Sequence, residues 1–398
     1  MAYGRKNRVR VDPFAYNQMY LGESGIGKTT LVYKMCEKYL GEDGYLFIEC
    51  GKENGEEAIE GINAVKAVSW ETPSDEEIEL YNMLENDNED DGEGIGGFED
   101  IIDDIVTNKA TEYPNLKVVV IDTYDELIKI AEPEVIAMHN RENPDKRVTS
   151  IKAAFGGFMA GEDKVDEIIL EKLFALNKVG VHFVVIGHTK RKEREDVFTG
   201  INYSQIAAAV GDRHFGNIKT KIPFLGVCFI DRDIVMQKTG KKNVVTKKEE
   251  ERGKIMSESR CVMFRDDNYS IDSKSRFAEI TNKKIPLNEQ AVYEAMVEAI
   301  KKEKERGGKS YDNDAANEKK LELKREQAIA EYTAKEKAKR DVAEGVNKIK
   351  AIVDDHKSDV DFLNHLKSVL AKLEIKSINS SLPLEKINAL LSELAEYE

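Results

Sequence analysis

The chain has 398 residues, 34% of them charged, and a formal net charge of −15 at pH 7. This length allows one large domain with an appended segment, and the acidic total excludes indiscriminate nucleic-acid binding, so any nucleic acid must be met at a local basic surface. Four widely spaced cysteines without a C-x-x-C pair exclude a disulfide framework and a zinc site, and no apolar stretch reaches about 18 residues, which favours a cytoplasmic protein with no membrane segment.

Apolar, β-rich runs alternate with helical stretches over roughly the first 230 residues, which is typical of an α/β domain with a mostly parallel sheet. Strands are predicted at residues 16–21, 44–50, 117–122, 181–187 and 223–230. The third and fourth runs, KVVVID and VHFVVIG, are almost continuously apolar, as expected of strands that helices cover on both faces. These two strands are therefore predicted to lie at the centre of the sheet.

An acidic segment separates the second and third strands. Residues 85–104 hold ten carboxylates, four glycines and no basic side chain. Such a block is typical of a solvated, flexible insertion, which is what we expect here. The alternative is a docking surface for a basic partner.

The rest of the chain predicts a domain boundary. Strands at residues 260–265 and 268–271 and a helix at about 288–306 complete a first domain spanning residues 1–306. The run GGKSYDND, residues 307–314, is predicted to be a linker. Residues 315–398 are predicted to form an all-helical C-terminal extension, with one long charged helix and two amphipathic helices whose apolar stripes pack on each other. This extension either has a structural role only or binds a protein partner.

The segment from Gly22 to Thr30 carries the most specific motif in the chain. Its sequence GESGIGKT matches G-x-x-x-x-G-K-[ST] and lies between a short apolar strand and the helical run LVYKMCEKYL. The glycines let the backbone curl so that N–H groups point at phosphates, and the helix that begins near Lys28 adds its positive end. The residues predicted to bind ATP are Gly22, Glu23, Ser24, Gly25, Ile26, Gly27, Lys28, Thr29 and Thr30.

Two side chains are predicted to hold Mg²⁺ beside this loop. One is the Thr29 hydroxyl, and the other is Asp122, the carboxylate that ends the apolar strand VVVID. Lys28 is expected to reach the β- and γ-phosphates. Asp125 and Glu126 follow in IDTYDEL, and they either position water or are helix N-terminal acids stabilised by the helix dipole.

Polar and basic side chains follow the strand VHFVVIG, at the edge of the sheet where α/β proteins bind ligands. His188 is predicted to contact the γ-phosphate and to report its presence to the following loop. That loop holds basic and aromatic side chains that suit the phosphates and bases of a single strand, namely Lys190, Arg191, Lys192, Arg194, Tyr203, Arg213 and Phe215. The alternative is a solvated charged loop, since Glu193, Glu195 and Asp196 dilute the basic run.

The phosphate loop, the VVVID strand, the IGH strand end and the late KSRF run together resemble the RecA-core P-loop ATPases, in particular phage-encoded AAA-type nucleotide-binding proteins associated with recombination and annealing. The resemblance covers residues from about 8 to 287. It implies a RecA-like core in which the phosphate-loop strand is flanked by the strands that end at Asp122 and Gly187. It also implies that His188 is the sensor that couples the nucleotide to a DNA-binding loop.

The KSRF run is similar to the K-N-R-F element of the RadA-like branch, whose basic side chains reach the nucleotide of a neighbouring subunit. The resemblance makes Lys274 and Arg276 candidates for fingers that act in trans, and it implies a homo-oligomer. RecA-like proteins also carry a water-activating glutamate just after the second strand, where this chain has Gly51. Glu53 or Glu49 is the expected substitute.

These features predict a Mg²⁺-dependent ATPase that acts on single-stranded DNA in recombination, annealing or replication, as an oligomer, and in the host cytoplasm if it is phage-encoded. One rival is a nucleotide-dependent switch or scaffold that recruits a partner through the C-terminal helices without significant turnover. A second rival is a small-molecule kinase in which the KRKER run serves as a basic lid.

Overall fold

The structure, a computed structural model, describes residues 9–52, 59–78, 94–242, 249–266, 271–306, 315–357 and 359–397. It has the mixed α/β architecture, the mostly parallel central sheet and the C-terminal helices that the sequence predicts. The chain divides into two compact units, one formed by residues 1–102 and 115–313 and the other by residues 103–114 and 314–398. No helix among the described residues is both long enough and apolar enough to span a membrane.

The first unit is built around a parallel sheet with the strand order β8-β1-β6-β5-β2-β3-β4. The strands are β1 (Gln18–Gly22), β2 (Tyr45–Cys50), β3 (Ala64–Ser69), β4 (Ile95–Gly97), β5 (Val118–Asp122), β6 (His182–Glu195) and β8 (Phe224–Lys242). Every residue of β5 is buried, as are residues 183–187 of β6, so the prediction that these two strands are central is confirmed.

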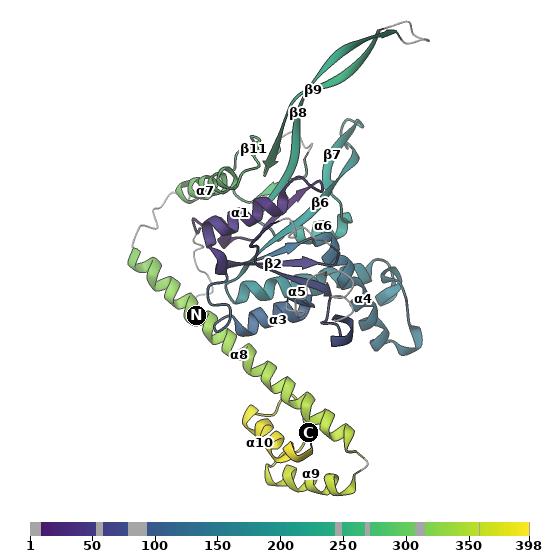
Figure 1. The fold of residues 1–398 in the computed structure, drawn as a ribbon, viewed down its shortest axis with the longest axis vertical. Coiled ribbons are helices and arrows are strands. Elements are labelled where there is room, and N and C mark those ends of the chain that lie inside the picture. The colour runs from purple at the N-terminus through teal and green to yellow at the C-terminus, as the bar shows by residue number, and fades with distance from the viewer. Residues whose placement is uncertain are drawn as a thin grey trace. The chain divides into compact units, whose positions relative to one another are not determined.

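Helices cover both faces of this sheet. α1 (Lys28–Leu40) and α7 (Glu289–Arg306) share one face, where their apolar side chains form a single core with those of β1, β2, β5 and β6. α4 (Tyr124–Glu142) and α5 (Ala160–Lys178) lie against the other face, and α6 (Asp212–Lys219) packs on α5 (Figure 1). Because β1, β6, β5 and β2 are parallel, their carboxyl ends meet at one edge, where the candidate functional side chains gather.

The structure differs from the flexible insertion expected at residues 85–104. Residues 85–93 lie outside the described part of the chain, but residues 95–97 form β4 and the helix α3 (Phe98–Asn108) follows directly. Phe98, Ile102 and Ile105 are fully buried, and their spacing of four and three residues is that of one helix face. The carboxylates between these apolar positions dominate the composition, which is why the sequence indicated an insertion rather than a helix.

β8 and β9 (Glu249–Met263) form a long antiparallel ribbon that extends well beyond the sheet (Figure 1). The sequence predicted only short strands at residues 223–230 and 260–265, because the charged segment between them lacks an apolar run. Apolar side chains along the ribbon are at least half exposed, namely Ile234, Val235, Met236, Ile255 and Met256. The root of the ribbon flanks β1 and so borders the functional edge of the sheet.

Short strands and the helices of the second unit complete the part of the chain that the structure describes. β7 (Asn202–Ala208) pairs with the distal part of β6, β10 (Lys274–Ser275) with β8, and β11 (Ile285–Pro286) with β9. In the second unit, α8 (Ala315–Asp355), α9 (Val360–Lys372) and α10 (Leu384–Leu394) form their own core. The predicted apolar stripes do pack on each other, and a Cβ at Gly345 of α8 would lie 2.3 Å from the Ile387 side chain of α10. The predicted linker at residues 307–314 lies outside the described residues.

Candidate functional site

The phosphate loop, residues 22–30, connects the carboxyl end of β1 to α1. Gly25 and Gly27 have φ angles of +73° and +103°, in the left-handed region that side chains disfavour. Gly22 is needed for a different reason, since a Cβ there would lie 3.0 Å from Cys228 Cβ on β8. Burial raises the pKa of the Cys228 thiol to about 12, so this neighbour of the loop is a packing group and not a nucleophile.

Lys28 and Thr29 begin α1 and direct their polar atoms into the loop. The Lys28 ammonium lies 3.1 Å from each of the carbonyl oxygens of Gly22 and Glu23, so the side chain curls back along the loop. The Thr29 hydroxyl donates a hydrogen bond to Asp122 Oδ2 at 2.6 Å. The structure thus brings together the loop and the end of β5, which are far apart in sequence.

The remaining loop positions contribute mainly backbone. Glu23, Ser24 and Thr30 are exposed, and the Ile26 side chain is buried in the core. The Ile26 carbonyl accepts a hydrogen bond at 3.2 Å from the Arg260 guanidinium on β9. This cation could not be predicted from the sequence, because it reaches the loop only through the antiparallel pairing of β9 with β8, for which a local pattern gives no signal.

β2 adds a second carboxylate at this edge of the sheet. Glu49 is paired in register with Asp122 across the parallel β2–β5 pair, so both side chains project from the same face. Glu49 is 2% exposed, and no described residue hydrogen-bonds its Oε1 atom. A buried carboxylate oxygen without a partner is costly unless another group meets it. The other expected substitute, Glu53, lies outside the described part of the chain.

The first turn of α4 directs two more carboxylates toward neighbouring strand ends. Asp125 accepts a hydrogen bond from the His188 backbone N–H at 2.9 Å, and its Oδ2 lies 3.5 Å from His188 Nδ1. Glu126 lies over Gly51, where φ is +65° and a Cβ would come 2.9 Å from Glu126 Oε2. Glu126 also forms an ion pair with Lys129. The space above Gly51 therefore holds a carboxylate that comes from a different element.

His188 stands between the phosphate loop and the β6–β7 hairpin, which we define as residues 189–208. β6 runs between β1 and β5, and the register places His188 beside Gly22. Directly beyond it, Thr189 begins the antiparallel pairing with β7. A movement of His188 would therefore displace Thr189, the first residue of the hairpin.

Lys274 and Arg276 lie away from the phosphate loop of their own chain. Lys274 is paired with Leu225, whereas Cys228 is the β8 residue level with Gly22. Three residues of strand correspond to about 10 Å, toward the opposite edge of the sheet.

Both side chains also have contacts within the chain, at the C-terminal end of α6. The Lys274 ammonium donates to the Lys219 carbonyl at 2.6 Å, and the Arg276 guanidinium donates to the Thr220 carbonyl. Burial lowers the pKa of Lys274 from its ordinary value. Cations at this position satisfy the carbonyls that a helix leaves unpaired at its end, which gives both residues a structural role.

The β6–β7 hairpin carries the basic side chains that the sequence analysis singled out. Lys192 and Arg194 both pair with Asp212, and Lys190 donates to a backbone carbonyl. The Arg191 side chain is exposed and makes no hydrogen bond or ion pair with any residue that the structure describes. It is therefore the basic side chain of the hairpin that is available to a ligand.

The aromatic side chains that are exposed differ in part from those expected to stack on bases. Phe215 was expected to suit base stacking, but it is 5% exposed because it lies on the apolar face of α6. Val197 and Phe198, at the tip of the hairpin, are 91% and 97% exposed, and Phe158, before α5, is 100% exposed. The flanking glycines in FGGFM and VFTGI were the available sequence signal for exposed apolar tips.

A protein family described as an AAA domain matches residues 16–261, which is more than half of the chain. The matched segment contains the phosphate loop, Glu49, Asp122 and His188, and it ends before Lys274 and the C-terminal helices. No curated protein matches the sequence.

Proposed function

Since the chain belongs to the AAA domain family, and so has a P-loop ATPase-like domain, we propose that it binds ATP with Mg²⁺ in the phosphate loop and hydrolyses it. The observation that carries this proposal is the hydrogen bond between Thr29 and Asp122. A hydroxyl beside a carboxylate supplies the hard oxygen ligands that Mg²⁺ uses together with phosphate oxygens and water. When bound, the ion would neutralise charge on the β- and γ-phosphates.

The side chains and backbone of the loop would bind and orient the triphosphate. The positive end of α1 and the curled backbone favour an anion. Lys28 would exchange its contacts with the carbonyls of Gly22 and Glu23 for phosphate oxygens. Arg260 holds the loop at Ile26 and adds a second positive charge from the same chain.

We assign water activation to Glu49. Hydrolysis needs a group that positions the attacking water and accepts its proton. Of the other carboxylates near Asp122, Asp125 is engaged with His188 and Glu126 with Lys129. Glu49 is buried beside Asp122 with an oxygen that no described residue meets, and the proton of the attacking water would go to this oxygen.

Single-stranded DNA is the polymer ligand that we propose for the β6–β7 hairpin. The hairpin combines Arg191, whose side chain has no partner among the described residues, with a nearly fully exposed Phe198 at its tip. Bases stack on exposed aromatic side chains without regard to sequence, and cations hold the phosphates. Because the hairpin begins directly after His188, DNA binding and the nucleotide site would be coupled through this residue.

Replacing Phe198 with alanine is expected to weaken binding of oligo(dT) by roughly 5- to 100-fold, because one stacking contact is lost. Fluorescence anisotropy of a labelled oligonucleotide at constant salt measures this change. Leu323→Ala is the matched control, since Leu323 is an exposed apolar residue of α8 in the other unit. If Phe198→Ala and the native chain bind oligo(dT) with equal affinity, the hairpin tip is not part of the DNA site.

We also propose a homo-oligomer in which Arg276 of one subunit serves the nucleotide of the next. The distance of the β10 region from its own phosphate loop favours this arrangement. Lys28→Ala retains Arg276 but not ATP, and Arg276→Ala retains the phosphate loop but not the finger. A mixture of the two is expected to hydrolyse ATP faster than the sum of the separate variants. If the rate of the mixture only equals the sum of the two separate rates, Arg276 does not act on a neighbouring subunit. Its role would then be the structural one at the end of α6.

One observation favours the alternative of a nucleotide-dependent switch or scaffold. The residue after β2 is Gly51, and the carboxylate above it, from Glu126, is paired with Lys129. A chain that depended on that position for turnover would bind ATP and keep it intact. Release of phosphate from bound ATP in a single-turnover experiment separates the two functions, since a switch would leave the nucleotide unhydrolysed.

A further inference from the structure

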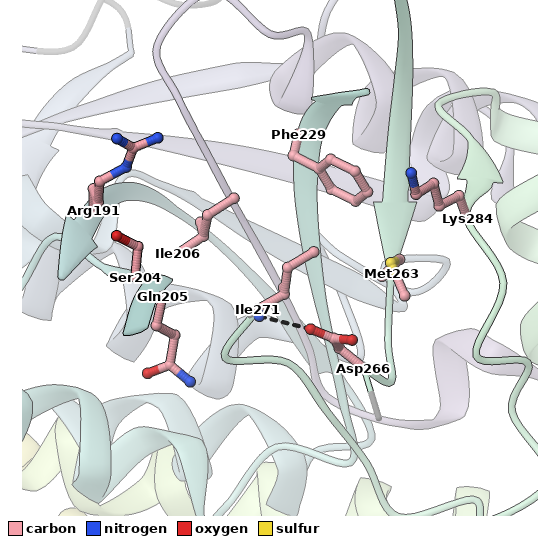
Figure 2. A pocket seen from close by; sticks show the side chains of 9 residues that line it. All are labelled: Arg191, Ser204, Gln205, Ile206, Phe229, Met263, Asp266, Ile271 and Lys284. Carbon is pink, nitrogen blue, oxygen red and sulfur yellow. Dashed lines mark hydrogen bonds between the residues drawn. The ribbon is translucent and has the colours of Figure 1, made fainter. Parts of the chain in front are cut away.

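A cavity of about 430 Å³ lies between the β6–β7 hairpin and the root of the β8–β9 ribbon, and the proposed ATP site does not use it (Figure 2). Hydrogen bonds from two backbone N–H groups hold its walls together. The Asp272 N–H donates to the Ile206 carbonyl at 2.9 Å, and the Ile271 N–H donates to the Asp266 carboxylate at 2.8 Å. The cavity is therefore built into the fold, with one wall on β7 and another on the ribbon.

The lining is apolar in the middle and basic at both ends. Ile206, Ile271 and the Phe229 ring line the middle of the cavity. Figure 2 shows Arg191 and Lys284 at opposite ends. The Lys284 ammonium lies 5.9 Å from the centre of the Phe229 ring and is paired with Asp231, whereas Arg191 has no partner among the described residues.

We propose that this cavity holds one nucleotide unit of a single-stranded nucleic acid, with the base against Phe229 and the adjoining phosphate at Arg191. The inference rests on the proposed DNA binding and assigns it a second contact beyond the hairpin tip. An aromatic ring in an apolar slot offers a stacking surface, and the volume falls in the range of small-ligand sites, about 300–1,000 Å³.

The position of the cavity favours a strand over a free nucleotide. Arg191 belongs both to the cavity and to the β6–β7 hairpin, so a strand that follows the hairpin from Phe198 would reach the cavity at its root. The guanidinium has no competing carboxylate among the residues described, which suits it to a phosphate. A free nucleotide has the phosphate loop as its own site.

Binding of labelled oligo(dT) by three variants tests this inference. Phe229→Leu keeps an apolar side chain but removes the aromatic face, and it is expected to weaken binding roughly 5- to 100-fold. Arg191→Gln is expected to lower the slope of log K against log salt by about one. Arg194→Gln is the matched control on the same strand, since Arg194 is paired with Asp212, and it should change the slope less. Unchanged ATP binding and circular dichroism show that each variant is folded.

Native-like affinity and salt slope in both Phe229→Leu and Arg191→Gln would overturn the inference. Phe229-dependent binding of dTMP, with oligo(dT) binding independent of Phe229, would make the cavity a free-nucleotide site and overturn the assignment to a strand. If oligo(dT) binding depends on Phe198 but not on Phe229, this inference fails while the proposed function stands. If the native chain binds ATP but no oligo(dT), the proposed DNA binding itself fails.

Discussion

Replacing Lys28 with alanine is expected to weaken binding of Mg²⁺-ATP by roughly two to three orders of magnitude and to abolish turnover. The Lys28 ammonium is the buried cation of the phosphate loop, and losing one partner of a buried, charge-assisted contact costs about 2–5 kcal/mol. The left-handed glycines and the Thr29–Asp122 hydrogen bond do not depend on this side chain, so the loop should keep its shape. Titration with a fluorescent ATP analogue measures the effect.

Lys34→Ala is the matched control for this substitution. Lys34 lies on the same helix, carries the same charge and is exposed on the surface away from the loop. It should leave the affinity for ATP within about twofold of the native value, because exposed charges contribute little. Comparable losses in both variants would show that α1 as a whole, and not the contact made by Lys28, sets the affinity.

Replacing Glu49 with glutamine is expected to lower the rate of hydrolysis by roughly 10²- to 10⁴-fold, because glutamine can hold a water molecule but cannot accept its proton. Binding of ATP should persist, since Glu49 lies at the end of β2 and not in the phosphate loop. The variant should also be at least as stable as the native chain, because an amide replaces a buried carboxylate whose Oε1 has no partner among the described residues. Single-turnover phosphate release tests the expected rate, and urea unfolding tests the expected stability.

Glu126→Gln distinguishes the two carboxylates that compete for this role. Glu126 lies over Gly51, but it is paired with Lys129, so its replacement should change the rate only a few-fold. If Glu126→Gln stops turnover and Glu49→Gln does not, the catalytic carboxylate comes from α4. The space left by Gly51 would then be the reason that α4 can supply it.

The parts of the site that could be predicted are those whose information is local. The phosphate loop needs glycines, a lysine and a threonine at fixed spacing between a strand and a helix, and all of this is visible in one short run. Asp122 could be placed because it ends an apolar strand. The central position of β5 and β6 followed from how continuously apolar these strands are, and the structure agrees. The expectation that the strands ending at Asp122 and Gly187 both flank the phosphate-loop strand is wrong, because β1 lies between β6 and β8 and β6 separates it from β5.

The parts that could not be predicted depend on contacts between distant segments. Arg260 reaches the phosphate loop only because β9 pairs antiparallel with β8. The ribbon is charged and has no periodic apolar pattern from which this pairing could be predicted. The burial of Phe215 follows from the docking of α6 on α5, which the composition of the loop did not reveal. The choice of Glu49 over Glu126 depends on which carboxylate already has a partner, and only the packed structure shows this.

The measurement that tests the account most directly is ATP turnover by the native chain with and without single-stranded DNA. We expect DNA to raise the rate of hydrolysis. Lys28→Ala and Glu49→Gln should abolish turnover under both conditions, the first by loss of ATP binding and the second with ATP still bound. ATP that remains bound and intact in the native chain, whether or not DNA is present, would contradict the account and make the chain a nucleotide-dependent switch.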